Sequence, residues 1–362
     1  MADLLSPTRP LAPVPAAPVH RHSRAAIEAE AKRLAKRIND PQRWGLEMCR
    51  MIAPLTLEIN RLKREQNVFL MAHSYQTPDI VYGVADAVGD SYGLAKQAKE
   101  SDADTILFSS VRFMAETAKI VNPDKRVLHP VPESGCSLAD GITPDDVRAL
   151  KQLHPGVPVV CYINTSAAVK AECNVSVTSA NFIQICRDLP GNELIFVPDK
   201  FMGAHIQGEL AGVKTVHVFD GACEVHEQFT ADAARAWRQA AADQGRDMVI
   251  LAHPECTGEV LLEADFVGSS EKMMAYAREL EALGRVDVMP ITECGTADRM
   301  RAEIPGLNIM GACVMCPHMK RTDLAAILQC LQDPRPDQVI EIPADVLAGA
   351  ERNLSEMFRL TA

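Results

Sequence analysis

The stretch MVILAHPEC (248–256) has two counterparts earlier in the chain, VFLMAHSY (68–75) and VPVVCYINT (157–165). Each is a short apolar run that ends in polar side chains, which is typical of a parallel strand whose carboxyl end opens on a ligand site. The three copies start about 90 residues apart. A fixed period of this length indicates an internal repeat of one structural unit.

Each copy continues with three more short runs, so every unit supplies four candidate strands. The second run leads to a serine and the fourth to a cysteine. In chain order the second runs are AVGDSYG (87–93), VSVTSAN (175–181) and FVGSSEK (266–272), the third are TILFSSV, ELIFVPD and VDVMPIT, and the fourth are RVLHPVP, TVHVFDG and LNIMGAC. Helical patterns alternate with these runs, which predicts parallel sheets with right-handed crossovers. The sequence therefore predicts an α/β fold of three α/β/α units, each with a four-stranded parallel sheet, related by pseudo-threefold symmetry around a central cavity.

The length of 362 residues and the hydrophobic content of 47% are sufficient for three small units that pack as one body. Apolar residues recur at helical spacing in 25–38 and 54–65, before the first unit. The expected organisation is a disordered proline-rich tail (1–24), N-terminal helices (25–65), three domains (66–148, 149–243 and 244–320) and C-terminal helices that pack back on the body (321–362).

Composition excludes several classes of function. The net charge is −11, so the chain has no basic footprint for nucleic acid or an anionic membrane surface. No apolar run has the length of a membrane span, and the N-terminal segment lacks the apolar core of a secretion signal. Eleven cysteines in such a chain indicate a reducing cytoplasm, where cysteines more often bind metal or catalyse than form disulfides. The dinucleotide-binding, P-loop and zinc-protease motifs are absent.

Cys136, Cys223 and Cys316 are 87 and 93 residues apart and follow the fourth run of each unit, in loops that contain glycine or proline. Three such cysteines can meet only if the three units surround one point, which predicts a metal or cluster with one ligand from each unit. A structural zinc site and an electron-transfer iron–sulfur cluster each need four ligands, so three leave one position open for Lewis-acid chemistry. Cys313 is a possible fourth ligand, but the other units have no counterpart, so we treat it as a neighbour. Other cysteines are interpreted as small buried hydrophobic residues, namely Cys49, Cys161, Cys186 and Cys330.

Ser91, Ser179 and Ser269 are 88 and 90 residues apart and occupy positions typical of helix N-caps. Each alone would indicate capping only. Three caps at the same end of three sheets would aim three helix N-termini inward, where carboxylate or phosphate is favoured. This pattern predicts a small, multiply anionic substrate.

His73 with Tyr75, and His253 with Glu255, end the first strands of units one and three. Residues i and i+2 of a strand point to the same side, so each pair is expected to face the cavity together. Histidine, tyrosine and glutamate are the candidates for proton transfer there.

Unit two ends its first strand in Tyr162 and Asn164, which are expected to line the same cavity. His226, three residues after Cys223, could orient substrate or support a ligand, and a structural role is an open alternative.

Taken together, these motifs resemble those of the quinolinate synthase family. The resemblance spans about residues 66–325 in the family's order and rests on a dozen segments: AHSYQ (72–76), GDS (89–91), FMAETAKIVNP (113–123), GCSLAD (135–140), YINTSAAVKAE (162–172), VTSAN (177–181), VPDKFMG (197–203), EVHE (224–227), HPEC (253–256), VGSS (267–270), TECG (292–295) and CPHMK (316–320).

The resemblance implies an enzyme that condenses iminoaspartate with dihydroxyacetone phosphate, with loss of water and phosphate, to give quinolinate for de novo NAD biosynthesis. It implies a [4Fe–4S] cluster held by Cys136, Cys223 and Cys316, with the fourth iron open as a Lewis acid. It also implies a supply of iminoaspartate from an aspartate oxidase or dehydrogenase. The residues implied to bind or convert the substrates are His73, Tyr75, Ser91, Tyr162, Asn164, Ser179, His226, His253, Glu255, Ser269 and Ser270.

Two alternatives stay open at this point. One is a different open-cluster enzyme, such as a reductive dehydroxylase of isoprenoid synthesis, which would need an electron donor and a diphosphate substrate. The other is a non-catalytic iron–sulfur or zinc protein, which would not need Tyr75, His253 and Glu255 in matching positions. Some relatives carry C-x-x-C-x-x-C, whereas this chain has only Cys313-x-x-Cys316, which leaves a regulatory thiol pair open.

Overall fold

The strands of the described chain form three parallel sheets of four strands each, and all three have the same strand order, second–first–third–fourth. The computed structural model describes residues 22–285, 287–311 and 313–361. Within these residues the predicted fold class is confirmed. Nearly all of the expected tail lies outside the described residues, so the prediction of disorder there is not tested.

Sheet one is built from the first repeat, and its helices follow each strand in turn. Its strands are β1 (Val68–His73), β2 (Ala87–Gly89), β3 (Thr105–Ser109) and β4 (Arg126–Leu128), and its helices are α3 (Pro78–Gly83), α4 (Ser91–Glu100), α5 (Arg112–Val121) and α6 (Ser137–Asp140). The central strand β1 pairs with β2 on one side and β3 on the other. Four of its six residues form a continuous buried run, as the unalternating sequence predicted.

Sheet two repeats this arrangement. Its strands are β5 (Val159–Tyr162), β6 (Val175–Val177), β7 (Glu193–Val197) and β8 (Thr215–Val218), and its helices are α7 (Pro144–Leu153), α8 (Ala167–Glu172), α9 (Phe182–Asp188), α10 (Lys200–Glu209) and the 3₁₀ turn η1 (His226–Gln228). The expected limit between the first two domains, at residues 148 and 149, falls inside α7. This helix is fixed by a capping box between Thr143 and Asp146, and it packs on α8.

Sheet three has the shortest outer strands. Its strands are β9 (Met248–Ala252), β10 (Phe266–Val267), β11 (Asp287–Ile291) and β12 (Asn308–Ile309), and its helices are α11 (Ala231–Ala242), α12 (Gly258–Glu263), α13 (Ser270–Ala282), α14 (Cys294–Glu303) and the 3₁₀ turn η2 (Met319–Arg321). Helix α11 precedes the limit expected at residue 243, yet it packs on β9 and α12. The exact limits of the three units stay predictions.

The chain begins and ends in helices outside the repeats: α1 (Arg24–Ile38), α2 (Leu46–Glu65), α15 (Leu324–Gln332), the 3₁₀ turn η3 (Pro336–Gln338) and α16 (Ala344–Leu360). Helix α2 starts well before the expected residue 54, and Pro54 lies inside it. Proline removes one backbone hydrogen bond from a helix. The helix continues because its face with Cys49 and Ala53 is buried against α1 and the first unit.

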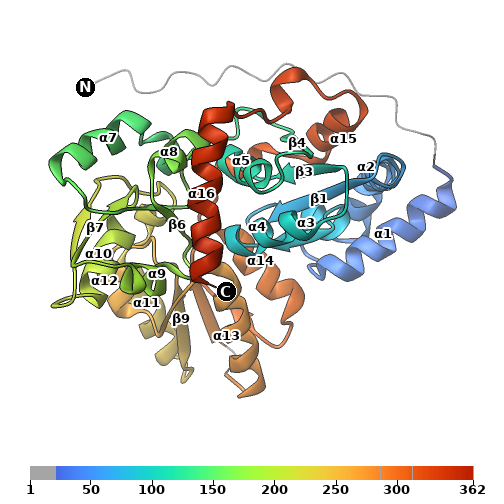
Figure 1. Ribbon diagram of the computed structural model, residues 1–362. Helices are drawn as coiled ribbons and strands as arrows, with labels where there is room; N and C mark the ends of the chain where they lie inside the picture. Colours follow the sequence, from blue (N-terminus) through green and yellow to red (C-terminus); the bar gives the residue numbers. More distant parts are fainter. Residues whose placement is uncertain (1–21, 286, 312, 362) are drawn as a thin grey trace, which may run out of the picture.

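Units one and two share a hydrophobic core. Figure 1 shows α16 running across the front of the molecule between units one and two. Leu354 and Met357 of this helix belong to the same buried cluster as Phe108 of unit one and Phe196 of unit two. Small repeats gain stability in this way, since each buries apolar surface against its neighbour.

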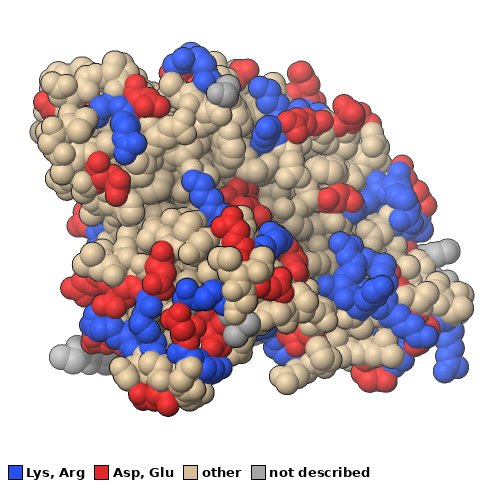
Figure 2. All heavy atoms as spheres, turned by 90° about the horizontal axis from the view of Figure 1, so that it is seen from below, with Lys and Arg blue, Asp and Glu red and all other residues tan. Residues whose placement is uncertain are grey.

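Charges of both signs are interspersed on the face shown in Figure 2. Ion pairs near the surface of the protein include Arg43 with Asp298 and Arg278 with Glu303. No helix in the described part of the chain is long and apolar enough to cross a membrane.

Candidate active site

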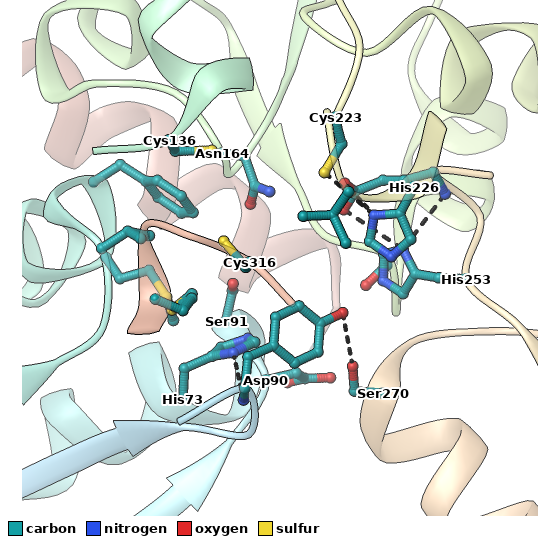
Figure 3. A pocket seen from close by; sticks show the side chains of 18 of the residues that line it. His73, Asp90, Ser91, Cys136, Asn164, Cys223, His226, His253, Ser270 and Cys316 are labelled. Atoms are coloured by element: carbon teal, nitrogen blue, oxygen red, sulfur yellow. Dashed lines mark hydrogen bonds and ion pairs between the residues drawn. The ribbon is translucent and has the colours of Figure 1, made fainter. Parts of the chain in front are cut away.

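A cavity of about 600 Å³, measured out to its opening, lies among the loops that follow the strands of all three sheets. Figure 3 shows its labelled side chains converging from different elements. The polar and sulfur-containing residues that line it are His73, Tyr75, Asp90, Ser91, Met114 and Cys136 from unit one, Tyr162, Asn164, Ser179, Cys223 and His226 from unit two, and His253, Glu255, Ser270, Cys316 and Met319 from unit three. Apart from Ser269, every residue predicted for the site contributes to this lining.

Cys136, Cys223 and Cys316 bring three sulfur atoms to this one cavity, each from the loop after a fourth strand. Burial raises the pKa of all three thiols, that of Cys136 to about 12. A metal would therefore have to displace three thiol protons. Three soft sulfur donors in a pocket closed by apolar groups suit an iron–sulfur cluster by their chemistry. Cys313 is exposed and is not part of the cavity lining. This position agrees with the interpretation of Cys313 as a neighbour of Cys316 and not as a fourth ligand.

Cys223 also belongs to a second potential donor group, with His226 and Glu255, whose ligand atoms lie within 4.8 Å of one another. His226 Nδ1 is 3.3 Å from Cys223 Sγ and 3.2 Å from Glu255 Oε2. His226 therefore links one sulfur donor to the buried carboxylate.

A chain of hydrogen bonds connects Tyr75 to Glu255 along the cavity wall. Tyr75 Oη lies 2.8 Å from Thr292 Oγ1, which lies 3.1 Å from His226 Nε2. His226 Nδ1 then contacts the Glu255 carboxylate, which also accepts a 2.6 Å hydrogen bond from the Tyr162 hydroxyl. Both ends of this chain line the cavity, whereas Thr292 is buried and does not.

The electrostatics assign protonation states at neutral pH. Burial by itself would raise the pKa of Glu255, but His226, His253 and the Tyr162 hydroxyl outweigh it and hold that pKa below its usual range. Burial lowers the pKa of His253 to about 3. Burial raises the pKa of Tyr75 well above its ordinary value, with a further contribution from Glu255. The site thus combines one carboxylate with neutral histidine and tyrosine donors.

His73 is a neutral donor as well. Burial, with a contribution from Arg299, lowers its pKa to about 3. Its Nδ1 accepts a hydrogen bond from the backbone N–H of Tyr75 at 3.1 Å. The proton of the neutral ring is therefore on Nε2, where it is free to bind an oxygen atom in the cavity.

The serines lie differently from the predicted caps. Asp90 caps α4 with a 3.0 Å hydrogen bond to Gly93, and Ser91 is the first helical residue. Asn181 holds the N-cap position of α9, two residues after Ser179. Only Ser269 is an N-cap as predicted, and its hydroxyl accepts from the Lys272 N–H. Aspartate is at least as good a cap as serine, so the helix uses Asp90 and leaves the Ser91 hydroxyl for the cavity.

Ser270 lines the cavity, whereas Ser269 is outside its lining and its hydroxyl accepts a hydrogen bond from the Lys272 N–H. The predicted contact of Ser269 with substrate stays a prediction.

The reason given for pairing His73 with Tyr75 is also wrong. Strand β1 ends at His73 and β9 ends at Ala252, so Tyr75, His253 and Glu255 lie beyond the strands. Each pair faces the cavity because the chain turns after the histidine. In this turn the backbone N–H of Tyr75 donates to His73 Nδ1, and that of Glu255 donates to His253 Nδ1.

Lys170 supports the site without having been predicted. It is fully buried, and its Nζ donates to the carbonyl oxygens of Ile163, at 2.7 Å, and Thr165. These two carbonyls flank Asn164, whose Oδ1 faces the cavity region without a hydrogen-bond partner among the described residues. A lysine within the apolar stretch SAAVKAE was the one sequence signal for this role.

Glu293 and Lys320 form a second support. The fully buried Glu293 carboxylate accepts from the Cys316 N–H at 3.2 Å and pairs with Lys320 at 2.9 Å. Lys320 also donates to the Tyr75 carbonyl oxygen. One ion pair therefore ties a sulfur donor to the tyrosine loop of another unit, a contact that no sequence pattern indicates.

Comparison with known proteins agrees with this geometry. Residues 57–359 match the family model described as "Quinolinate synthetase A protein". The chain is 42% identical over 328 residues to a quinolinate synthase of Caulobacter vibrioides (strain NA1000 / CB15N), covering 88% of this chain and 84% of the relative. It is 44% identical over 299 residues to a quinolinate synthase of Agrobacterium fabrum, covering 82% and 83%. It is 43% identical over 301 residues to quinolinate synthase 1 of Mesorhizobium japonicum, covering 83% and 88%.

Proposed function

The chain belongs to the quinolinate synthetase A family, and from this premise we propose that it condenses iminoaspartate with dihydroxyacetone phosphate to quinolinate, with loss of water and phosphate. The observation that carries the proposal is the cavity itself. Three sulfur donors, a buried carboxylate and several neutral hydroxyl and imidazole donors line one space.

Cys136, Cys223 and Cys316 would hold a [4Fe–4S] cluster and leave one iron without a protein ligand. That iron would supply Lewis-acid chemistry, which polarises an oxygen and makes it a better leaving group. Support comes from the three sulfurs in one cavity and from the Glu293 contact that fixes the Cys316 backbone.

The rest of the lining suits oxyanions. The hydroxyls of Ser91 and Ser179 and the Nε2–H of His73 are donors at the cavity, and Ser270 lines it with a hydroxyl that donates to Tyr75 Oη at 3.3 Å. Neutral donors bind carboxylate or phosphate without leaving a charge buried alone. We assign them to the substrate carboxylates and phosphate.

We assign proton transfer to the hydrogen-bonded chain from Tyr75 through Thr292 and His226 to Glu255. In this arrangement protons can shift along the hydrogen-bonded chain from Tyr75 toward the Glu255 carboxylate. A proton that Tyr75 takes from the substrate is then balanced by a proton that Glu255 returns to it. The two steps must be concerted, because the raised pKa of Tyr75 and the lowered pKa of Glu255 oppose a free phenolate.

A second candidate is a single metal ion held by Cys223, His226 and Glu255, which the proximity of their ligand atoms favours. That arrangement would leave Cys136 and Cys316 in the cavity without a role, so we prefer the three-sulfur assignment. We also place the enzyme in a reducing cytoplasm, with iminoaspartate supplied by an aspartate oxidase or dehydrogenase.

The test is an anaerobic assay of quinolinate formation from the two substrates, with metal analysis of the same preparation. About four irons and four sulfides per chain, with turnover, support the proposal. One tightly bound zinc without iron would favour the second candidate. A fully loaded cluster without quinolinate formation would refute the proposed reaction.

A further inference from the structure

A second cavity, which we call the outer groove, lies against the first. It measures about 760 Å³ out to solvent, and residues of units two and three line it. The residues that bear on its chemistry are Ser179, Asn181, Arg187, His205, Gly268 and Lys272.

The outer groove and the central cavity share one wall. Ser179 lines both of them. Pro254 lines the groove, while its neighbours His253 and Glu255 line the central cavity, and Gly268 lines the groove two residues before Ser270 lines the cavity. The two cavities are therefore adjacent and have Ser179 in common.

The charge of the groove is opposite to that of the protein. The net charge of the chain is −11, yet none of the described residues that line the groove is an aspartate or glutamate. Arg187 forms no ion pair within the described chain, and its side chain is exposed. Glu271, which follows Ser270, is instead held by Arg299 and Ser74.

Lys272 stands at the seam between the two units. Its Nζ donates to the Ala180 carbonyl oxygen at 2.7 Å, which joins α13 to the loop that carries Ser179. One of the three ammonium protons is used there, so two are left for a ligand.

An unsatisfied buried donor also marks the groove. Asn181 is 7% exposed, and its Oδ1 accepts from the Thr178 N–H at 2.7 Å. Its Nδ2 has no hydrogen-bond partner in the described chain. A buried amide without a partner is costly, and it indicates a ligand or water that completes it.

His205 adds a neutral donor. Burial lowers its pKa, against the opposing effect of Glu209 on α10, so the ring carries one N–H at neutral pH. A guanidinium, an ammonium and two neutral donors form a set that suits a phosphate or carboxylate group.

We propose that the outer groove is an entry site for a small oxyanion, where the phosphate or carboxylate of a substrate binds to Arg187, Lys272 and Asn181 before it passes Ser179 into the central cavity. The identity of the anion rests on the proposed function, whereas the preference for an oxyanion does not. The two substrates share this chemistry, and kinetics distinguishes them.

The first test compares Arg187→Gln and Lys272→Met, singly and together, with the wild type and with Lys36→Met. Lys36 is exposed on α1 and far along the chain from the groove, so this control removes one charge without touching the site. In the groove variants kcat/KM should fall roughly 5-fold per lost charge at low ionic strength, and the loss should shrink in about 1 M salt, where the screening length is only ~3 Å.

The substrate whose KM rises is the one that uses the groove. If kcat/KM for both substrates matches that of Lys36→Met at low salt, the entry site is wrong.

The second test does not depend on turnover. Lysine acylation by an activated ester, read by mass spectrometry, should be slower at Lys272 in the presence of inorganic phosphate and unchanged at Lys36. Arg187→Gln should abolish this protection. Protection that survives in Arg187→Gln would show that Arg187 takes no part in binding the phosphate, and no protection at all would mean that the groove binds no oxyanion. Either result overturns the inference, even for a preparation that makes no quinolinate.

Discussion

Gly295 is the position at which one added methyl group should disturb the site most. It lies in the first turn of α14, against the tyrosine loop of unit one. A Cβ at this position would lie 2.7 Å from the Ser74 carbonyl oxygen and 2.7 Å from Tyr75 Cα. Both contacts are with backbone, so no side-chain rotation relieves them.

The expected magnitude follows from these distances. Carbon atoms pack at about 3.5–4.0 Å, so the tyrosine loop must retreat by roughly 1 Å in Gly295→Ala. A shift of this size in a catalytic group costs on the order of 100-fold in rate. Overpacking of this kind also lowers the free energy of unfolding by about 1–3 kcal/mol. Tyr75 is held by Thr292 and Lys320, so its displacement would strain both contacts.

The matched control is Gly208→Ala in α10, where an added Cβ meets no atom within 4 Å. Alanine is the better helix former, so this variant should be as stable as the wild type or more stable by about 0.5–1 kcal/mol, with normal turnover. The assays are anaerobic quinolinate formation and denaturant unfolding, with iron content measured on the same samples. A Gly295→Ala enzyme with turnover within twofold of the wild type would refute the claim that this contact sets the position of Tyr75.

Three further predictions concern single groups. Thr292→Val should lower kcat by about 100-fold at unchanged iron content, whereas Thr292→Ser keeps the hydroxyl between Tyr75 and His226 and should retain most activity; equal rates in the two variants would exclude the relay. Cys136→Ser should lose the cluster, measured as iron and sulfide per chain after anaerobic purification, and a full complement in that variant would contradict the ligand assignment. Burial lowers the pKa of His129 from 6.5 to about 4. Between these two pH values the histidine is protonated in the unfolded state but not in the folded state. The free energy of unfolding should therefore fall by about 3 kcal/mol as the pH drops from 6.5 to 4. His129→Asn should flatten that dependence in denaturant titrations, and parallel curves for the two proteins would show that the histidine does not titrate as described.

The repeat explains why so much of the fold could be predicted from the sequence. Strands such as 248–252 are buried on both faces, so their sequence is apolar without alternation. A buried parallel strand can therefore be recognised from its own few residues. Matching positions in a repeat must fall at matching places in space, which is why Cys136, Cys223 and Cys316 line one cavity as predicted.

Local patterns misled where two residues compete for one role. Asp90 and Ser91 are adjacent, both can cap a helix, and only the backbone conformation decides which one does. The helical spacing was recognised only from residue 54, yet α2 starts at Leu46 and continues through Pro54, because its buried face outweighs the hydrogen bond that proline removes.

By itself, the sequence determined the three-unit α/β architecture, the presence of the three cysteines in one cavity and most of the polar lining, because matching positions recur with a fixed period. Only the tertiary structure decided how the lining is held. Thr292 bridges Tyr75 and His226, Lys170 holds the carbonyls beside Asn164, and Glu293 with Lys320 joins two units. The contacts of Thr292 and Lys320 join different units, and the period of the repeat does not specify such contacts. Their partners lie up to hundreds of residues apart, and a hydrogen bond over such a separation leaves no pattern along the chain.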